Sequence, residues 1–134
     1  YPMDVDLYQS QKALDNGKWA LKEGGIIIMV SKCRQGTGNA AFLTQLSSSS
    51  DPKQVIENIK NGYKLGYHKA AKMAEIATWA SIWAVTDLDQ EILRKANITP
   101  YATVDAAVQA ALEQKPQARV LVLMDGSVTI PRVQ

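Results

Sequence analysis

Apolar positions of the chain follow helical spacing in some segments and form unbroken runs in others. The first segment, residues 6–24, carries a stripe of leucines at helical spacing and opens on a possible helix cap, Asp6, with Gln9 three residues later. Residues 26–30 are all Ile, Met or Val, as in a strand that is buried on both faces of a parallel sheet. The run at 119–124 has the same character. The pattern therefore predicts an opening helix and at least two buried strands.

The remaining segments continue the alternation of strands and helices. We expect helices at 39–46, 52–61, 67–78, from a cap at Thr86 or Asp87 to Ala96, and from Thr103 to Pro116, and further strands at 79–85, 101–102 and 128–130. Strands that alternate with helices predict an α/β fold, a three-layer sandwich with a mainly parallel, Rossmann-like sheet. At 134 residues the chain has the usual length of one domain, so we expect residues 1–134 to form a single domain.

Composition and charge narrow the classes of partner. The chain is 46% hydrophobic and 21% charged, which is typical of a folded globular domain. Its net charge of +2 argues against nucleic acid or an anionic membrane as the main partner, because both require a strong basic excess. Cys33 is the one cysteine, so no internal disulfide can form, and we expect a reducing, cytoplasmic location.

The strongest candidate site lies at the start of the opening helix. Tyr8, Gln9 and Lys12 are spaced to share one face, away from the leucine stripe. Lys12 beside free backbone N–H groups at a helix N-terminus would bind a carboxylate or a phosphate. The alternative is that Gln9 only completes the cap while Lys12 pairs with Asp15 or Asn16. The residues alone leave both interpretations open.

A second candidate is the loop at 33–38, which follows the first buried strand. Open α/β sheets bind ligands at the carboxyl ends of their strands. Gly36 and Gly38 would let a ligand approach the backbone, and Arg34 could bind an anion. The alternative is a flexible loop with a solvated arginine. We expect Cys33 to be a small, partly buried residue and not a nucleophile.

A third candidate is the basic entrance of the helix at 67–78. His68 and Lys72 share a face there, next to Tyr67. A basic helix entrance could bind an anion, or His68 could move protons near neutral pH. The alternative is a solvated basic face.

The ordered set of motifs resembles the C-terminal domain of the nickel-dependent lactate racemase family over essentially the whole chain. The residues that carry the resemblance are Asp6-Leu7-Tyr8-Gln9 with Lys12, Glu23-Gly24-Gly25, Arg34-x-Gly36-x-Gly38, Gly66-x-His68-Lys69-Ala70 and Asp87-Leu88-Asp89. The resemblance implies a two-domain racemase or epimerase of 2-hydroxy acids with a cleft between its domains. We therefore expect this chain, which opens at Tyr1, to be the C-terminal domain of a longer enzyme and to be inactive alone.

The resemblance also implies the cofactor and the site residues. The family uses a nickel pincer nucleotide bound covalently to the N-terminal domain, which also supplies the catalytic histidines and the nickel ligand. We accordingly expect no catalytic residue and no metal site in this chain. Cofactor or substrate contact is assigned to Gln9 and Lys12 with Tyr8 beside them, and less directly to Arg34, Tyr67 and His68. The partners expected are the chain's own N-terminal domain and a small 2-hydroxy acid.

One different class of function stays open from the residues. The glycines of the 33–38 loop also suit a non-catalytic, Rossmann-like module that binds a small ligand or a protein.

Overall fold

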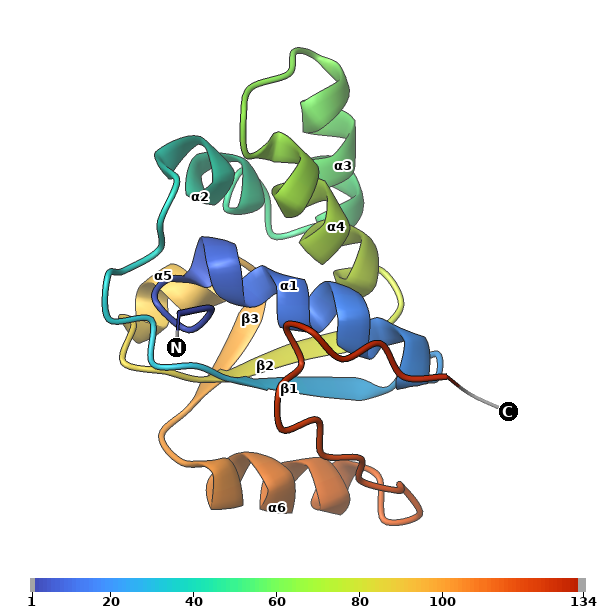
Figure 1. Ribbon diagram of the computed structural model, residues 1–134. Helices are drawn as coiled ribbons and strands as arrows, with labels where there is room; N and C mark the ends of the chain where they lie inside the picture. Colours follow the sequence, from blue (N-terminus) through green and yellow to red (C-terminus); the bar gives the residue numbers. More distant parts are fainter. Residues whose placement is uncertain (1, 133–134) are drawn as a thin grey trace.

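The computed structural model describes residues 2–132, which fold as alternating helices and strands (Figure 1). The elements in chain order are α1 (Leu7–Gly17), a 3-10 turn (Lys18–Ala20), β1 (Ile26–Val30), α2 (Ala40–Leu46), α3 (Pro52–Lys60), α4 (Tyr67–Ala77), β2 (Ser81–Val85), α5 (Gln90–Lys95), β3 (Ile98–Tyr101) and α6 (Val104–Gln114). These bounds confirm the predicted helices after residue 38 and the strand at 26–30, and β2 lies within the strand predicted at 79–85. The third strand extends further toward its N-terminus than predicted. The opening helix, predicted to run to residue 24, is shorter: it ends at Gly17 and is followed by the 3-10 turn.

The strands form one parallel sheet in the order β1-β2-β3. Ile26 lies opposite Ser81 in the first pair, and Ile82 lies opposite Ile98 in the second. Helix α6 covers one face of the sheet, and α1 and α4 lie on the other side (Figure 1). The α/β class and the parallel pairing are therefore confirmed.

Side-chain caps explain where most of the helices begin. Their carboxylate, amide or hydroxyl oxygens accept a hydrogen bond from a backbone N–H of the first turn, which has no partner within the helix. The capping residues are Asp6, Asn39, Asp51, Asp89 and Thr103.

The predicted cap of α5 at Thr86 or Asp87 is wrong. Asp89 is the cap, because its carboxylate accepts from the N–H groups of Glu91 and Ile92. The hydroxyl of Thr86 accepts from the N–H of Leu88 and so stabilises the turn before the helix.

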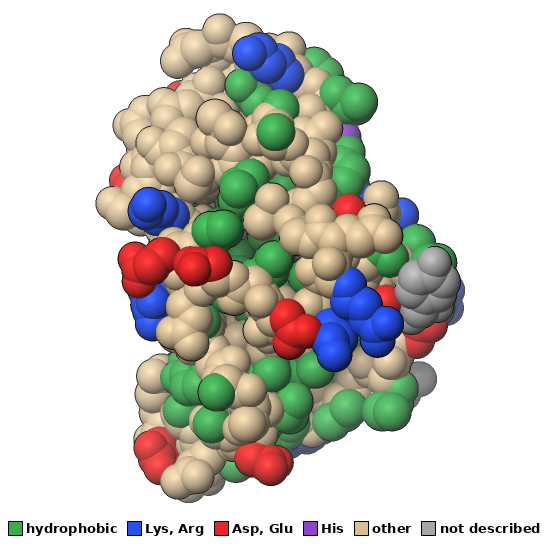
Figure 2. Space-filling view, turned by 90° about the vertical axis from the view of Figure 1, so that its left-hand side faces the viewer, with side chains coloured by type: hydrophobic (Ala, Val, Ile, Leu, Met, Phe, Trp, Pro, Cys, Tyr) green, Lys and Arg blue, Asp and Glu red, His purple; other side chains and the backbone are tan. Residues whose placement is uncertain are grey.

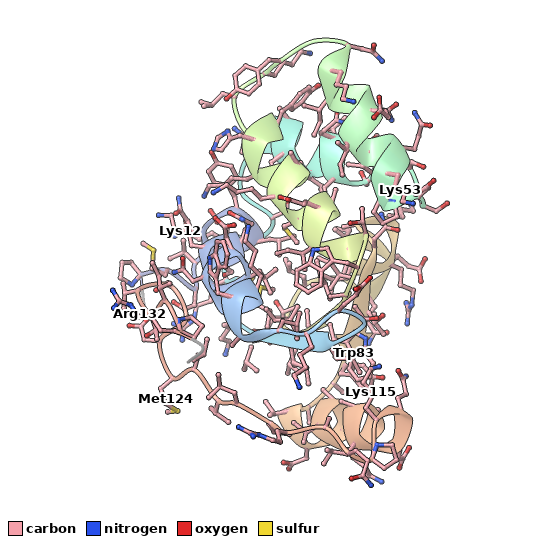
Figure 3. The ribbon with its side chains drawn as sticks, turned by 90° about the vertical axis from the view of Figure 1, so that its right-hand side faces the viewer. Lys12, Lys53, Trp83, Lys115, Met124 and Arg132 are labelled. Atoms are coloured by element: carbon pink, nitrogen blue, oxygen red, sulfur yellow. The ribbon has the colours of Figure 1, made fainter. Side chains whose placement is uncertain are left out.

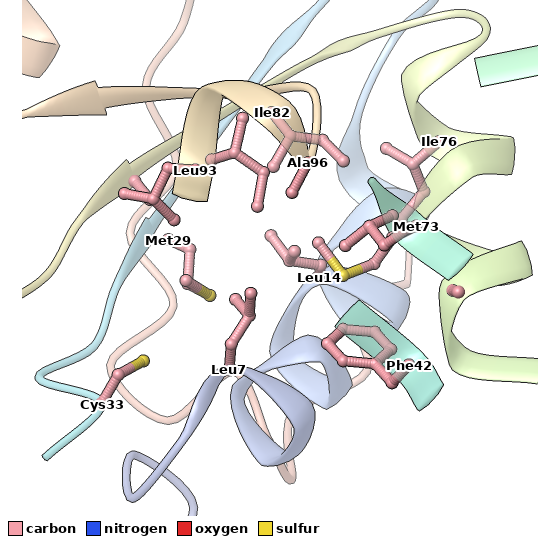
Figure 4. Packing of buried hydrophobic residues seen from close by; sticks show 14 residues of the cluster. Leu7, Leu14, Met29, Cys33, Phe42, Met73, Ile76, Ile82, Leu93 and Ala96 are labelled. Atoms are coloured by element: carbon pink, nitrogen blue, oxygen red, sulfur yellow. The ribbon is translucent and has the colours of Figure 1, made fainter. Parts of the chain in front are cut away.

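The core lies between the sheet and the helices on the α1 side (Figure 4). Leu7 and Leu14 of the predicted stripe are fully buried there, against Phe42 of α2 and Met73 of α4. Each of these side chains contributes about 1.5–3 kcal/mol through removal of apolar surface from water. Because Leu7 and Leu14 are anchored in this way, α1 has one orientation, in which Lys12 lies at the surface.

The two apolar runs predicted as strands near the C-terminus are wrong. Residues 119–124 and 128–130 form no strand, and Val122 is 70% exposed. The segment is attached to α1 instead, where the Asn16 amide donates to the carbonyl oxygens of Gly126 and Ser127. Figure 2 shows hydrophobic side chains at the surface around α6.

The prediction that β1 is buried on both faces is also wrong. Ile26, Ile27 and Ile28 are only partly buried, and Val30 is 61% exposed. Within residues 2–132, β1 is also an edge strand, because it pairs with β2 alone. An apolar run shows that a segment suits a strand, but it cannot show whether a neighbouring strand is present.

None of the described helices has the length and apolar character needed to cross a lipid bilayer.

Candidate functional site

The N-terminal half of α1 displays the Tyr8–Gln9–Lys12 face, the three residues singled out by their spacing. Tyr8 and Gln9 are half-buried, and Lys12 projects from α1 into solvent (Figure 3). The Lys12 ammonium lies 3.8 Å from the Met3 thioether, a weak acceptor, and within residues 2–132 it has no carboxylate partner. Its positive charge is therefore available to an anion from elsewhere.

The alternative in which Lys12 pairs with its helix neighbours is wrong. The Asp15 carboxylate accepts from Lys18 at 2.8 Å and also pairs with Lys72 of α4. Asn16 donates to the chain end at Gly126 and Ser127. Both neighbours are thus occupied by other partners.

The prediction of free N–H groups at the start of α1 is wrong as well. The N–H groups of Leu7 and Tyr8 donate to the carbonyl oxygens of Gly36 and Thr37, at 3.2 and 3.3 Å. The N–H of Gln9 donates to the Asp6 carboxylate at 2.6 Å. Since the first turn is satisfied internally, an anion at this face would bind the side chains of Lys12 and Gln9 and not the helix N-terminus.

The 33–38 loop folds back along the segment that leads into α1. The N–H of Cys33 donates to Asp4, and that of Gln35 donates to Val5. A Cβ atom at Gly38 would lie 2.7 Å from the Cβ of Tyr8, so glycine at this position lets the loop contact α1 closely. This glycine therefore serves packing against Tyr8 and not backbone approach to a ligand.

Two further residues of the loop, Arg34 and Cys33, differ in their exposure to solvent. Arg34 is exposed, so its guanidinium can reach a partner outside the chain. Cys33 is 3% exposed and so more deeply buried than the partly buried residue predicted, and its Sγ lies 3.4 Å from the Ser31 hydroxyl. Its φ of 53° places it in the left-handed region that few side chains adopt.

Helix α4 begins at Tyr67, after its N-cap residue Gly66, and both Tyr67 and His68 contact Tyr63. The Nδ1 atom of His68 lies 3.2 Å from the hydroxyl of Tyr63, and the Tyr63 ring packs edge-to-face on Tyr67. Within residues 2–132 no hydrogen bond or ring contact joins either residue to Tyr8. The structure thus brings together Tyr8, Gln9 and Lys12, and it leaves Arg34, Tyr67 and His68 outside that group.

Lys69 belongs to the site, although its spacing in the sequence gives no sign of it. Its ammonium donates to the backbone oxygen of Tyr8 at 2.6 Å and lies 3.8 Å from the centre of the Tyr8 ring. Burial lowers the pKa of Lys69, and the positive charge of Lys12 lowers it further, whereas Asp6 opposes the shift. The motif Gly66-x-His68-Lys69 contained this residue, but only the fold brings it to α1.

Asp15 fixes the other end of the α1–α4 contact. Partial burial disfavours its ionised form, but hydrogen bonds from Lys18 and Lys72 outweigh that effect and lower the pKa of the Asp15 carboxyl. Asp15 is therefore an anion at neutral pH that Lys18 and Lys72 neutralise, while Lys12 has no carboxylate partner in residues 2–132.

Metal-ligating side chains do not gather anywhere in residues 2–132: no group of three His, Cys, Asp or Glu residues is placed to hold an ion. The described part of the chain can bind and orient an anion through an ammonium and an amide, beside an aromatic ring. It offers no cluster that would hold nickel.

Comparisons with known proteins agree on one family. The model of the family described as "Lactate racemase C-terminal domain" matches residues 1–130. The lactate racemase of Lactiplantibacillus plantarum is 31% identical over 132 residues, which are 94% of this chain and 31% of that protein. The lactate racemase of Thermoanaerobacterium thermosaccharolyticum is 39% identical over 59 residues, 44% of this chain and 14% of that protein.

The fold agrees with a solved structure as well. The structure of the lactate racemase apoprotein from Thermoanaerobacterium thermosaccharolyticum superposes with a TM-score of 0.80 and 28% identity, covering 87% of this chain and 29% of that one. The chain thus spans at most about a third of the length of the relatives it matches.

Proposed function

This chain belongs to the lactate racemase C-terminal domain family, and on that basis we propose that it forms one wall of the active-site cleft in a longer 2-hydroxyacid racemase or epimerase. The observation that carries the proposal is the exposed Lys12 ammonium, which has no carboxylate partner within residues 2–132 and lies on the same helix face as Gln9. In this proposal the rest of the enzyme lies across the cleft from that face.

The role of the Tyr8–Gln9–Lys12 face is to bind and orient an anionic group. Lys12 would contact the carboxylate of a 2-hydroxy acid or a phosphate of the cofactor, and a charge-assisted hydrogen bond of this kind is shorter and stronger than a neutral one. The Gln9 amide would add a donor that sets the orientation, and the Tyr8 ring would exclude water beside it. Orientation of this kind lowers the barrier because the reacting groups are already placed.

The charge of Lys12 suits an anionic group of the family's cofactor. The described residues offer no metal cluster, so nickel would be held by other parts of the enzyme, while Lys12 and Gln9 suit an anionic group of a nickel pincer nucleotide. When bound, the cofactor supplies the acceptor for the hydride of the substrate carbon. Because the residues that move the hydroxyl proton would also lie outside this chain, we expect the chain alone to be inactive.

Replacement of Lys12 tests the assignment. In the full-length enzyme we expect Lys12→Ala to lower kcat/KM for a 2-hydroxy acid about tenfold to a hundredfold, since a hydrogen bond to a charged group contributes about 1.5–3 kcal/mol. The matched control is Lys53→Ala, which removes another exposed lysine, on α3, at a distance from α1 (Figure 3). Unchanged turnover in Lys12→Ala, with unchanged circular dichroism, would remove this face from the active site.

The alternative function, a non-catalytic ligand-binding module, is less well supported by the loop at 33–38. The N–H groups of Cys33, Gln35 and Gly36 already donate to carbonyl oxygens of this chain, so they cannot cradle a phosphate. Calorimetric titration of the chain with mononucleotides separates the two functions. Affinity in the micromolar range would favour the module, because the cleft proposal expects little binding without the rest of the enzyme.

A further inference from the structure

Lys69 makes the contact that joins the start of α4 to the Tyr8–Gln9–Lys12 face. Its ammonium donates to the Tyr8 carbonyl at 2.6 Å and lies over the Tyr8 ring, 3.8 Å from the centroid. The Tyr8 ring also packs edge-to-face against the Phe42 ring, and the two ring centroids are 5.4 Å apart. Tyr8 is thus fixed by one cation and one aromatic ring from two different helices.

The surroundings of Lys69 are unfavourable for a positive charge. The side chain is partly buried, Lys12 and Lys72 are nearby like charges, and Asp6 is the carboxylate that acts on it favourably. Within residues 2–132 Lys69 forms no ion pair, whereas Lys72, one helical turn further along α4, is paired with Asp15. The fold therefore holds the Lys69 ammonium where no carboxylate of residues 2–132 pairs with it. Its hydrogen bond and its ring contact are both with Tyr8.

The carbonyl that Lys69 binds also belongs to the helical hydrogen bond that leads to Lys12. In an α-helix the carbonyl of residue i accepts from the N–H of residue i+4, so the Tyr8 carbonyl faces the backbone of Lys12. A second donor on that carbonyl fixes the first turn of α1 from outside the helix. A shift of this turn would move Tyr8, Gln9 and Lys12 together.

We propose that Lys69 is a positioning residue for the Tyr8–Gln9–Lys12 face, and that its charged ammonium is needed to hold the Tyr8 ring and the first turn of α1 in place. The functional part of this inference rests on the proposed function, and the structural part does not. The charge is the essential feature because a neutral amine binds the ring face and the carbonyl less strongly.

The structural part is tested by NMR of the Tyr8 ring in the 134-residue chain, with Tyr8→Phe used to assign its signals. We expect Lys69→Met to shift the ring signals toward those of an exposed tyrosine, and Lys69→Arg to keep them close to the wild type, because arginine also carries a charge that stacks on aromatic rings. Lys72→Met is the matched control: it breaks another α1–α4 contact, with Asp15, but does not touch Tyr8. Unchanged Tyr8 signals in Lys69→Met overturn the proposal.

An alkaline titration of the wild type covers the case in which Lys69→Met does not fold. The Tyr8 signals should change together with the loss of the Lys69 proton, at a pH below the usual range of lysine, because burial and Lys12 lower the pKa of Lys69. Because a phenol also ionises in alkaline solution, the change is read from the ring signals in the Tyr8→Phe background. Arginine stays charged throughout, so the change should be absent there when Lys69→Arg is added. Tyr8 signals that do not follow the Lys69 titration overturn the proposal.

Turnover of the full-length enzyme tests the functional part. We expect Lys69→Met to lower kcat/KM about tenfold to a hundredfold, as for other losses of alignment, and Lys69→Arg to restore most of it, while Lys72→Met stays near the wild type. If Lys12→Ala has no effect on turnover, the proposed function fails while the NMR result on Tyr8 still stands. If Lys12→Ala is damaging but Lys69→Met is not, the positioning role alone is overturned.

Discussion

At the scale of single residues, the position of Tyr8 depends on a glycine that faces it. Gly38 has a φ of +80°, and a Cβ atom there would lie 2.7 Å from the Cβ of Tyr8. Gly36 has nearly the same backbone conformation, with a φ of +82°, but a Cβ atom there would meet nothing within 4 Å. The two glycines therefore differ in the contact with α1 and not in backbone strain.

This difference gives a matched pair of variants. We expect Gly36→Ala to lower the free energy of unfolding by about 1 kcal/mol through strain at positive φ. Gly38→Ala should lower it by about 1–3 kcal/mol more, because the methyl group must displace α1 or the loop. Urea denaturation measures both values. Equal losses in the two variants would show that Gly38 is not packed tightly against Tyr8.

The site residues show which part of a site a sequence can predict. The spacing of Tyr8, Gln9 and Lys12 predicts that they share a helix face, because residues three and four apart do so. Their assignment to a binding site rests on the resemblance to the family and stays a prediction. The contact between Lys69 and Tyr8 could not be found in this way, since it joins residues 61 positions apart and depends on how α4 crosses α1. The free N–H groups expected beside Lys12 failed for the same reason, since Gly36 and Thr37 reach them from another segment.

At the scale of elements, an ion pair between α1 and α4 makes the fold depend on pH. Asp15 binds Lys18 on its own helix and Lys72 on α4, and these bonds lower the pKa of its carboxyl. Because the folded pKa lies below the unfolded one, this contribution to stability is complete above about pH 4 and is lost as the pH falls through the folded pKa.

The variant Asp15→Asn tests this account. We expect it to lower the free energy of unfolding at pH 7 by about 1 kcal/mol, the value for a partly exposed pair, and to reduce the loss of stability between pH 5 and about pH 2. Glu57→Gln is the control, because its pair with Lys60 is solvent-exposed and should contribute little. Thermal unfolding across this pH range gives the comparison, and parallel curves for Asp15→Asn and the wild type would contradict it.

The elements themselves were predicted well where the signal is local. Asp6 was predicted as a cap and begins α1, because its side chain satisfies the nearby N–H of Gln9, and this signal is visible in a few consecutive residues. The run at 119–124 was misread because a strand also requires a partner strand, and within residues 2–132 none pairs with it. The Rossmann-like arrangement stays a prediction, since an order of β1-β2-β3 contains no point at which the strand order reverses.

At the scale of the whole molecule, we propose that the chain is one wall of an active site that other parts of a longer enzyme complete. It spans 31% of the Lactiplantibacillus plantarum lactate racemase that it resembles, and its described residues contain no metal cluster. It does present a cation, Lys12, that no carboxylate of residues 2–132 neutralises. Together these observations support a face that binds an anion held by the rest of the enzyme.

The reactivity of Lys12 toward an amine-modifying reagent tests this claim most directly. In the full-length enzyme, mass spectrometry would measure acetylation of Lys12 and of Lys53 with and without a saturating 2-hydroxy acid. We expect the ligand to protect Lys12 severalfold and to leave Lys53 unchanged, since a lysine bound to a carboxylate is both shielded and held in its unreactive charged form. Equal modification of Lys12 with and without the ligand would contradict the proposed role of this face.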